Sequence, residues 1–178
     1  HRGESPYAAA FRHFLQPPDR LLVAPDNRAY GRTYTPLEAL HAGNGDEAYL
    51  YHGWYWPERW GNTPMRWAMR CASLVLALPH GAQALRWRLF PRQDAAETAL
   101  TVIAQRHTPE GYVEAQRQRI LLSGPPSAEP CSGVTAVDLA PGDYRLVLLA
   151  DSARIEPGFF PRQIGFGLAE LAVSTGGR

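Results

Sequence analysis

The side chains that could bind a ligand are concentrated in one short stretch, residues 51–61, which reads YHGWYWPERWG. Four large aromatic rings fall within its first six positions, followed by Pro57-Glu58-Arg59 and one more tryptophan. Successive side chains of an extended strand point to opposite faces, so Trp54, Tyr55 and Trp56 cannot all point inward. We therefore expect at least one of these rings to be exposed or covered by another element.

Aromatic rings next to polar side chains are a pattern typical of carbohydrate binding. The apolar C–H face of a sugar stacks on an aromatic face, while acidic, amide and guanidinium groups bind the hydroxyls. In this interpretation the tryptophans stack on or border the ligand, and Glu58 orients the loop or accepts a hydroxyl proton. Arg59 and Arg66 could bind an anionic sugar or a phosphate. The predicted ligand-binding residues are Trp54, Trp56, Glu58, Arg59, Trp60, Arg66 and Trp67.

The same residues also have a structural interpretation. The tryptophans would then fill the ends of a hydrophobic core, and Glu58 would pair with Arg59 or Arg66 or accept backbone N–H bonds. Pro57 and Gly61 indicate a loop at the end of the stretch in either case. Trp87 belongs to a regular alternating segment, and we expect it in the core.

Other chemistry has little support in the sequence. The spacings GxSxG, GxxxxGK[ST], GxGxxG and HExxH are absent, and the histidines and carboxylates are scattered. We expect no catalytic activity and no cofactor; a hydrolase or esterase with an unrecognised site is the enzymatic alternative. Residues 44–47 (Asn-Gly-Asp-Glu) could bind a structural calcium ion, although a plain turn fits them as well. Cys71 and Cys131 could form one disulfide or remain two thiols.

The charge balance excludes nucleic acid as the expected partner. The 178 residues carry a net charge of +1, with 18 basic residues that are all arginine. No apolar run approaches the roughly 18 residues of a membrane-spanning helix, and no signal peptide is visible. Because the chain starts at His1, we expect a processed product or a piece of a longer protein.

Alternating hydrophobic residues and frequent turn residues predict an all-β fold. Gly and Pro number 16 each, which favours many short strands. In one clear case Leu85, Trp87 and Leu89 point inward while Arg86 and Arg88 point outward. No repeated strand-helix alternation is present, so an antiparallel, jelly-roll-like β-sandwich is predicted. Its strands are expected near residues 48–52, 71–79, 84–90, 98–105, 118–122, 134–139, 144–149 and 166–173.

The N-terminal residues differ from this pattern. Ser5-Pro6 is a favourable helix start, and Tyr7, Phe11, Phe14 and Leu15 share one helical face before Pro17-Pro18 ends it. We predict two regions, an N-terminal helix with an irregular linker at residues 1–36 and the β-sandwich domain at residues 37–178. The linker contains a short apolar strand candidate at residues 21–23.

Residues 42–79 contain a motif that resembles a known type of module. A glycine-asparagine stretch is followed by a strand, a G-W-x-x-x-E-x-W-G motif, a later tryptophan and an L-x-L-x-L-P strand. The pattern resembles a carbohydrate-binding-module-like β-sandwich associated with bacterial glycosyltransferases and surface-polysaccharide membrane proteins. The matching residues are Gly53, Trp54, Glu58, Trp60, Gly61, Trp67, Leu74, Leu76, Leu78 and Pro79.

The C-terminal part extends this resemblance, with one departure. Arg162, Ile164, Gly165 and Leu168 fit the closing strand of such modules. The acidic residue that usually precedes the arginine is missing, because Phe160-Pro161 stands there. If that acid normally pairs with the arginine, Arg162 must find another partner.

The resemblance covers roughly residues 40–173 and implies an extracytoplasmic module, periplasmic or at the cell surface. It would be a non-catalytic, carbohydrate-binding-like accessory to bacterial surface-glycan synthesis or to a glycosyltransferase. Its implied partners are a glycan or lipid-linked sugar and a membrane-embedded host or partner protein. The alternative is a structural or protein-interaction β-sandwich without a sugar ligand.

Overall fold

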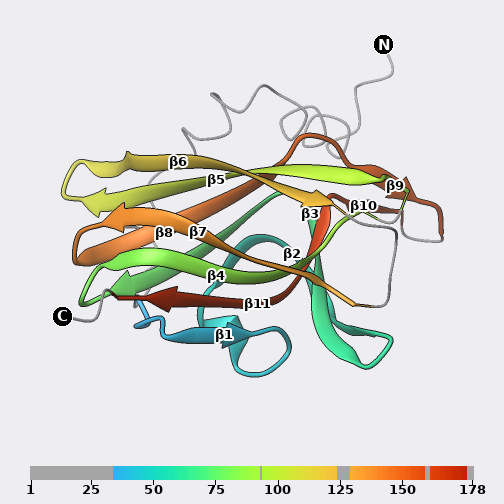
Figure 1. Cartoon of the computed structure of the whole chain (residues 1–178), viewed down its shortest axis with the longest axis horizontal. Helices are drawn as coiled ribbons and strands as arrows, with labels where there is room; N and C mark the ends of the chain where they lie inside the picture. Colours follow the sequence, from blue (N-terminus) through green and yellow to red (C-terminus); the bar gives the residue numbers. More distant parts are fainter. Residues whose placement is uncertain (1–33, 93, 124–128, 159–160, 176–178) are drawn as a thin grey trace, which may run out of the picture. The chain divides into compact units, whose positions relative to one another are not determined.

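A computed structural model describes residues 34–92, 94–123, 129–158 and 161–175 of the chain (Figure 1). These residues belong to one compact unit, Thr33–Arg178. The helix predicted after Ser5-Pro6 and the short strand predicted at residues 21–23 lie outside the described residues.

The described part is built from strands, as the sequence predicted. The one helical segment there is a 3-10 turn, η2 (Asp46–Ala48). The strands are β1 (Ala39–His41), β2 (Leu50–Trp60), β3 (Thr63–Leu78), β4 (Ala82–Phe90), β5 (Glu97–Thr108), β6 (Gly111–Ser123), β7 (Cys131–Leu139), β8 (Gly142–Ala150), β9 (Arg154–Glu156), β10 (Arg162–Ile164) and β11 (Phe166–Ser174).

The strands form an antiparallel β-sandwich with jelly-roll-like connections, which confirms the predicted fold class. The hydrogen-bonded order is β6-β5-β8-β3-β11-β4-β7, while β1 pairs with β11 and β2 pairs with β3. In Figure 1, β6, β5 and β8 occupy the upper half and β4, β11 and β1 the lower half. A separate two-stranded ladder joins β9 and β10.

The long strand β3 connects the two layers of the sandwich. Its residues 66–68 pair with β11, whereas Cys71–Leu78 pair with β8. The same strand pairs with β2 along the other edge, so β2 and β3 form a hairpin at one end of the sandwich. The hairpin therefore shares strand β3 with both layers of the sandwich.

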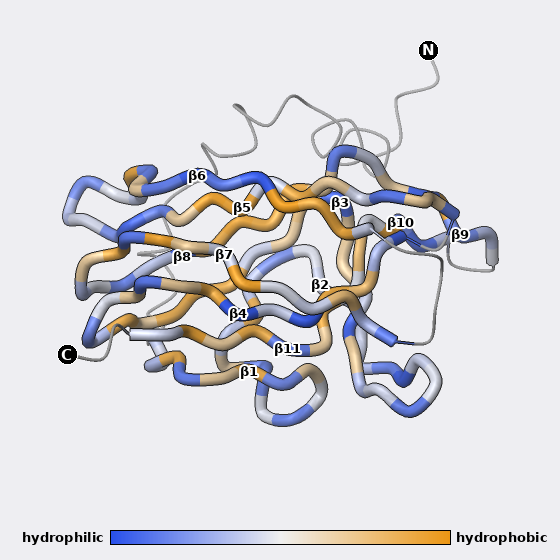
Figure 2. The backbone as a smooth tube through the Cα atoms, in the orientation of Figure 1, coloured by the Kyte–Doolittle hydropathy of each residue, from blue (hydrophilic) through white to orange (hydrophobic). Residues whose placement is uncertain are grey.

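The main core lies between the two layers and follows the predicted alternation. Leu74, Leu76 and Leu78 of β3 are buried against leucines of β8, β4 and β11. Figure 2 shows hydrophobic residues along these central strands and hydrophilic residues around the β2–β3 turn. Burial of alternate apolar side chains is thus what fixes the register of these strands.

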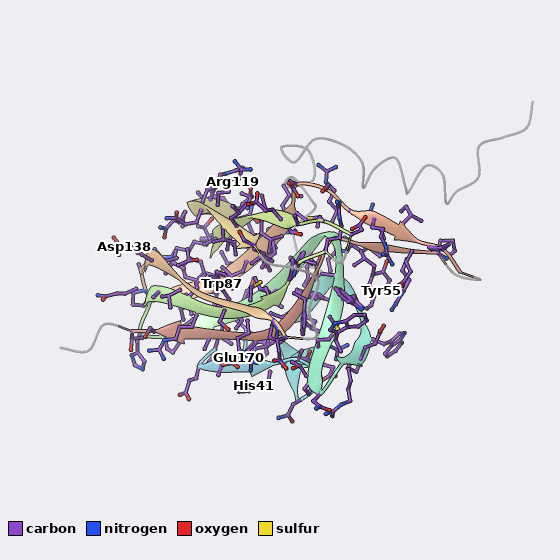
Figure 3. All side chains as sticks on the ribbon, turned by 45° about the vertical axis from the view of Figure 1, so that its right-hand side comes forward. His41, Tyr55, Trp87, Arg119, Asp138 and Glu170 are labelled. Atoms are coloured by element: carbon purple, nitrogen blue, oxygen red, sulfur yellow. The ribbon has the colours of Figure 1, made fainter. Side chains whose placement is uncertain are left out.

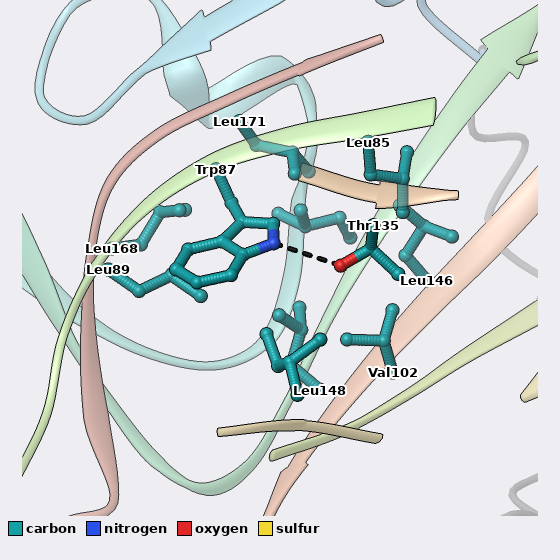
Figure 4. A pocket seen from close by; sticks show the side chains of 11 residues that line it. Leu85, Trp87, Leu89, Val102, Thr135, Leu146, Leu148, Leu168 and Leu171 are labelled. Atoms are coloured by element: carbon teal, nitrogen blue, oxygen red, sulfur yellow. Dashed lines mark hydrogen bonds between the residues drawn. The ribbon is translucent and has the colours of Figure 1, made fainter. Parts of the chain in front are cut away.

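Trp87 is partly buried and packs against this core. Its indole N–H donates a hydrogen bond of 3.0 Å to Thr135 Oγ1 (Figure 4). The space left beside it is an apolar cavity of about 10 Å³, which has room for no more than one water molecule. A Cβ atom at Gly133 would lie 2.2 Å from the Trp87 ring, so only glycine fits there. The expected core position of Trp87 is confirmed.

The prediction of a loop at Pro57–Gly61 is wrong. Strand β2 continues through Pro57 to Trp60, and the chain turns only at Gly61 and Asn62. Proline is tolerated because a register irregularity precedes it, between Trp54 and Pro57, and ladder pairing resumes at Pro57–Arg66. The aromatic stretch is therefore held by backbone pairing with β3.

Candidate functional site

The β2–β3 hairpin carries the aromatic stretch, and its pairing is irregular. Three register shifts separate Leu50 from Pro57. Gly53 allows one bend, with a φ of 81° and a hypothetical Cβ only 2.1 Å from the Cys71 carbonyl oxygen. Between Trp54 and Pro57, β2 has one residue more than the facing part of β3. Such a bulge redirects side chains that strict alternation would place on one face.

Trp54 and Trp56 show the consequence of that bulge. The Trp54 ring packs against the main core, edge-to-face with Phe166 at 5.9 Å between centroids. Its indole N–H donates to the Ser73 carbonyl oxygen at 2.8 Å. Trp56, two residues later, is 84 % exposed. The sequence expectation that at least one large ring remains in solvent is met by Trp56.

Trp60 and Trp67 belong to a second, smaller core on one face of the hairpin. Trp67 is 4 % exposed and packs with Met65, Phe90 and Ile164. Trp60 lies edge-to-face on it, with 6.0 Å between ring centroids. The Trp67 ring therefore has no free face on which a sugar could stack, because it is buried in this smaller core.

An open pocket of about 390 Å³ lies beside the exposed ring. It is lined by Leu50, Tyr51, His52, Gly53, Trp54, Tyr55, Trp56 and Arg66. The wall thus combines aromatic surface with hydroxyl, imidazole and guanidinium groups. Burial lowers the pKa of His52, so its imidazole is neutral at pH 7. A pocket of this size matches a small-molecule or sugar-sized ligand, in contrast to the cavity beside Trp87.

Arg66 anchors the hairpin to the 3-10 turn η2. Its Nε and Nη2 atoms donate to the two carboxylate oxygens of Asp46 at 2.5 and 2.8 Å. Nη2 also binds Glu47 at 2.6 Å, and Nη1 donates to the Tyr55 carbonyl oxygen at 3.1 Å. Burial alone would raise the pKa of Asp46, but the hydrogen bonds from Arg66 and from the Gly43 backbone hold it below its usual value.

The bonds of Arg66 change the interpretation of two sequence features. The acidic side chains of residues 44–47, considered above for calcium, both bind this guanidinium. Arg66 itself was expected to bind an anion, yet four of its five N–H groups have acceptors among the described residues. Its role here is to hold the wall of the pocket.

Arg162 fastens the opposite face of the hairpin. It donates to Glu58 and, at 2.8 Å, to Glu156 of β9. Burial alone would lower the pKa of Arg162, but Glu156 and Glu58 raise it above its usual value. Arg162 therefore pairs with these two glutamates in place of the acidic residue that is missing next to it in the sequence. The structural interpretation that paired Glu58 with Arg59 or Arg66 is wrong, because the partner lies 104 residues away.

Tyr55 strengthens this attachment. Its hydroxyl donates to the Gln163 carbonyl oxygen at 3.2 Å and accepts from the Gln163 backbone N–H at 2.9 Å. The Arg162 guanidinium lies 5.6 Å from the centre of the Tyr55 ring. Figure 3 shows Tyr55 at the hairpin end of the molecule and Asp138 at the other end. Arg59 is exposed at the hairpin turn, where it donates to the Asn62 carbonyl oxygen.

Other kinds of site have no counterpart in the part of the chain that the structure describes. No group of three or more His, Cys, Asp or Glu side chains there could hold a metal ion. Within the same residues, no helix has the length and hydrophobicity of a membrane span. Cys71 and Cys131 are separate thiols, and burial raises the pKa of Cys71.

Sequence reasoning did not assign Leu50, Tyr51 or His52 to the pocket that they line, and it missed Glu156 as the partner of Arg162. Asp46 and Glu47 were considered only as calcium ligands or a plain turn, and Glu156 carried no motif. The missing acid before Arg162 was the one available signal, because it pointed to an unknown partner for that guanidinium. Tyr55 was recognised only as one of three adjacent rings.

Comparison with known proteins gives similarity in structure alone. No family model matches the sequence, and no curated protein is significantly similar to it. The structure is similar to that of a family 6 carbohydrate-binding module of Clostridium stercorarium, solved with cellobiose. The two sequences are 12 % identical and the TM-score is 0.49. The match covers 82 % of this chain and 99 % of that one.

Two further solved structures have lower scores. A second family 6 carbohydrate-binding module is 9 % identical with a TM-score of 0.44, over 80 % of this chain and 98 % of that one. A family 43 arabinoxylan arabinofuranohydrolase of Bacillus subtilis, solved with cellotetraose, is 10 % identical with a TM-score of 0.46. This match covers 80 % of the present chain but 28 % of the hydrolase.

Proposed function

We propose that the pocket beside Trp56 binds a carbohydrate and that the domain is a non-catalytic binding module. The observation that carries this proposal is the Trp56 ring, 84 % exposed at an open pocket of about 390 Å³. Leaving an indole ring in water is unfavourable, and the position of this ring at an open pocket favours a role in binding. The apolar face of a sugar ring would cover it.

The polar groups of the pocket suit a hydroxyl-rich ligand. Tyr51 and His52 line the pocket with a hydroxyl and an imidazole, and Arg66 contributes part of its guanidinium surface. Sugars need several such directional partners next to an apolar platform. Of the predicted binding residues, Trp54, Trp56 and Arg66 line the pocket and would contact the ligand. Glu58, Trp60 and Trp67 would position the hairpin, and Arg59 would border it at the turn.

The finer context of the function comes from the motif in residues 42–79. The G-W-x-x-x-E-x-W-G pattern supports an accessory role in bacterial surface-glycan synthesis or beside a glycosyltransferase. In that role the module would be extracytoplasmic, at the surface or in the periplasm. Its ligand would be a glycan or the sugar part of a lipid-linked intermediate, near a membrane-embedded host or partner.

Isothermal titration of the domain with a panel of oligosaccharides tests the proposal. We expect saturable heat with at least one sugar and a loss of roughly tenfold or more in affinity for Trp56→Ala, since stacking contacts of large rings dominate such sites. Trp87→Phe serves as the matched control and should bind normally. Binding that survives Trp56→Ala, or no binding with any sugar, would contradict the proposal and favour a protein-interaction role for the exposed ring.

A further inference from the structure

The charged groups around the pocket restrict the kind of sugar that it can bind. This inference rests on the proposed carbohydrate-binding function. Arg66 is the charged side chain among the described residues that line the pocket, and the other ionisable base there, His52, is neutral at pH 7 because burial lowers its pKa. Whether the pocket attracts anions therefore depends on whether neighbouring acids already neutralise the positive charge of Arg66.

The charge of Arg66 is already compensated twice. Asp46 binds it through both carboxylate oxygens at 2.5 and 2.8 Å, and Glu47 binds it at 2.6 Å. One positive charge thus faces two negative charges, which leaves this group with one net negative charge. The Glu47 side chain is largely exposed, so its charge acts on solvent beside the pocket wall. An approaching carboxylate or phosphate would be repelled by this group.

The other arginines described near the hairpin do not line the pocket. Arg70 of β3 donates to the Ala150 carbonyl oxygen, and Arg145 of β8 is buried and donates to Gln105. Arg162 is bound to Glu58 and Glu156. Glu156 also contacts Arg154 at 3.4 Å, so these two arginines and two glutamates balance. Arg59 lies at the turn and does not line the pocket.

We propose that the pocket selects sugars that carry no anionic group, and that Glu47 is the residue that excludes acidic ones. Uronic acids, sulfated sugars and the phosphate of a lipid-linked sugar would all be disfavoured. The earlier expectation that Arg66 recruits an anionic sugar or phosphate is replaced by the opposite role. A nearby like charge in a partly solvated site weakens binding about tenfold.

The test compares neutral polysaccharides with carboxymethylated forms of the same polymers, using tryptophan fluorescence as the signal. Hydroxyethylcellulose, dextran, xylan and galactomannan would each be titrated beside their carboxymethylated forms, at low salt and at 0.5 M salt. We expect at least one neutral polymer to bind and its carboxymethylated form to bind about tenfold more weakly at low salt. The difference should shrink at high salt, because salt screens exposed charges.

Two variants identify the residue responsible. Glu47→Gln should bring the charged polymer close to the neutral one in affinity, whereas Asp138→Asn at the other end of the molecule should change neither. Equal or tighter binding of the charged form, lost on Trp56→Ala, would overturn the charge selection and leave the carbohydrate function standing. A difference unaffected by both salt and Glu47→Gln would also overturn it, since bulk would then be the cause. If no polymer changes the fluorescence, the carbohydrate function fails and the inference with it.

Discussion

The core around Trp87 and the hairpin around Trp56 place two tryptophans in opposite surroundings. Trp87 of β4 packs against the main core beside a small apolar cavity of about 10 Å³. Trp56 stands after a bulge in β2, beside an open pocket of about 390 Å³. In the first region the ring packs against leucines of the facing strands, and in the second the ring is exposed beside a bulge.

The two regions also differ in what holds them together. Leucines from facing strands hold the core, with a single side-chain hydrogen bond at Trp87. Two arginines hold the hairpin, Arg66 on one face and Arg162 on the other. Apolar packing tolerates acid and salt, whereas ion pairs respond to both. The comparison therefore predicts different responses of the two regions to mutation and pH.

The largest expected effect is the removal of the buried arginine. Arg66→Met leaves the Asp46 carboxylate buried without its partner, which costs about 3–5 kcal/mol in the free energy of unfolding. Urea denaturation measures this loss. Arg59→Met is the matched control on the same hairpin, and its exposed position predicts a change within about 0.5 kcal/mol. Similar losses for the two variants would show that the buried ion pair does not hold the hairpin.

A cavity in the core should destabilise the protein without altering the pocket. Leu74→Ala removes a fully buried side chain between the layers, and we expect a loss of about 2–5 kcal/mol. The exposed Leu121 provides the control, since Leu121→Ala should have little effect. Iodide quenching of tryptophan fluorescence should remain as in the wild type. A changed quenching profile in folded Leu74→Ala would mean that the two regions are not structurally separate.

Acid should weaken the Arg66 attachment before it affects the apolar core. The pKa of Asp46 is lower in the folded protein than the ordinary value of 3.8, so the folded state favours its ionised form. This contribution is present above pH 3.8 and is lost as the pH falls through the folded pKa. The difference in unfolding free energy between wild type and Asp46→Asn should thus be constant near neutrality and shrink on acidification below pH 3.8. A difference that widens instead would contradict the assignment.

The half-exposed attachment on the other face should matter less. Glu58→Gln keeps the shape of the side chain and removes the charge that faces Arg162. Because both partners are partly solvated, we expect a loss of no more than about 1 kcal/mol in unfolding free energy. Thermal unfolding in low and high salt measures it, and high salt should reduce the difference. A loss as large as that for Arg66→Met would contradict the expectation that the Arg66 attachment contributes more stability than the Arg162 attachment.

The comparison also explains what the sequence could and could not predict. Alternation in residues 71–79 and 84–90 predicted β3 and β4, because burial of every second side chain leaves a direct pattern. Adjacent rings at Trp54–Trp56 predicted that one must be exposed. Which one depends on the bulge, and a bulge changes register without changing residue types.

Partners distant in the chain were beyond sequence reasoning. Glu58 and Arg162 meet because β10 packs beside the hairpin strand β3, and nothing local to either residue specifies this. Asp46 looked like a turn residue until Arg66 was placed opposite it. The strand continuing through Pro57 was missed because proline usually interrupts pairing, and here it follows the irregularity.

The central claim is that Trp56 is the accessible ring of the aromatic stretch and the platform for a ligand. Iodide quenching of tryptophan fluorescence, with and without a bound sugar, tests it most directly. Trp56→Phe should remove most of the quenchable emission, Trp67→Phe should leave it intact, and a sugar that binds should protect it in the wild type. If Trp56→Phe leaves the quenchable fraction unchanged, or bound sugar does not protect it, the account of this site is contradicted.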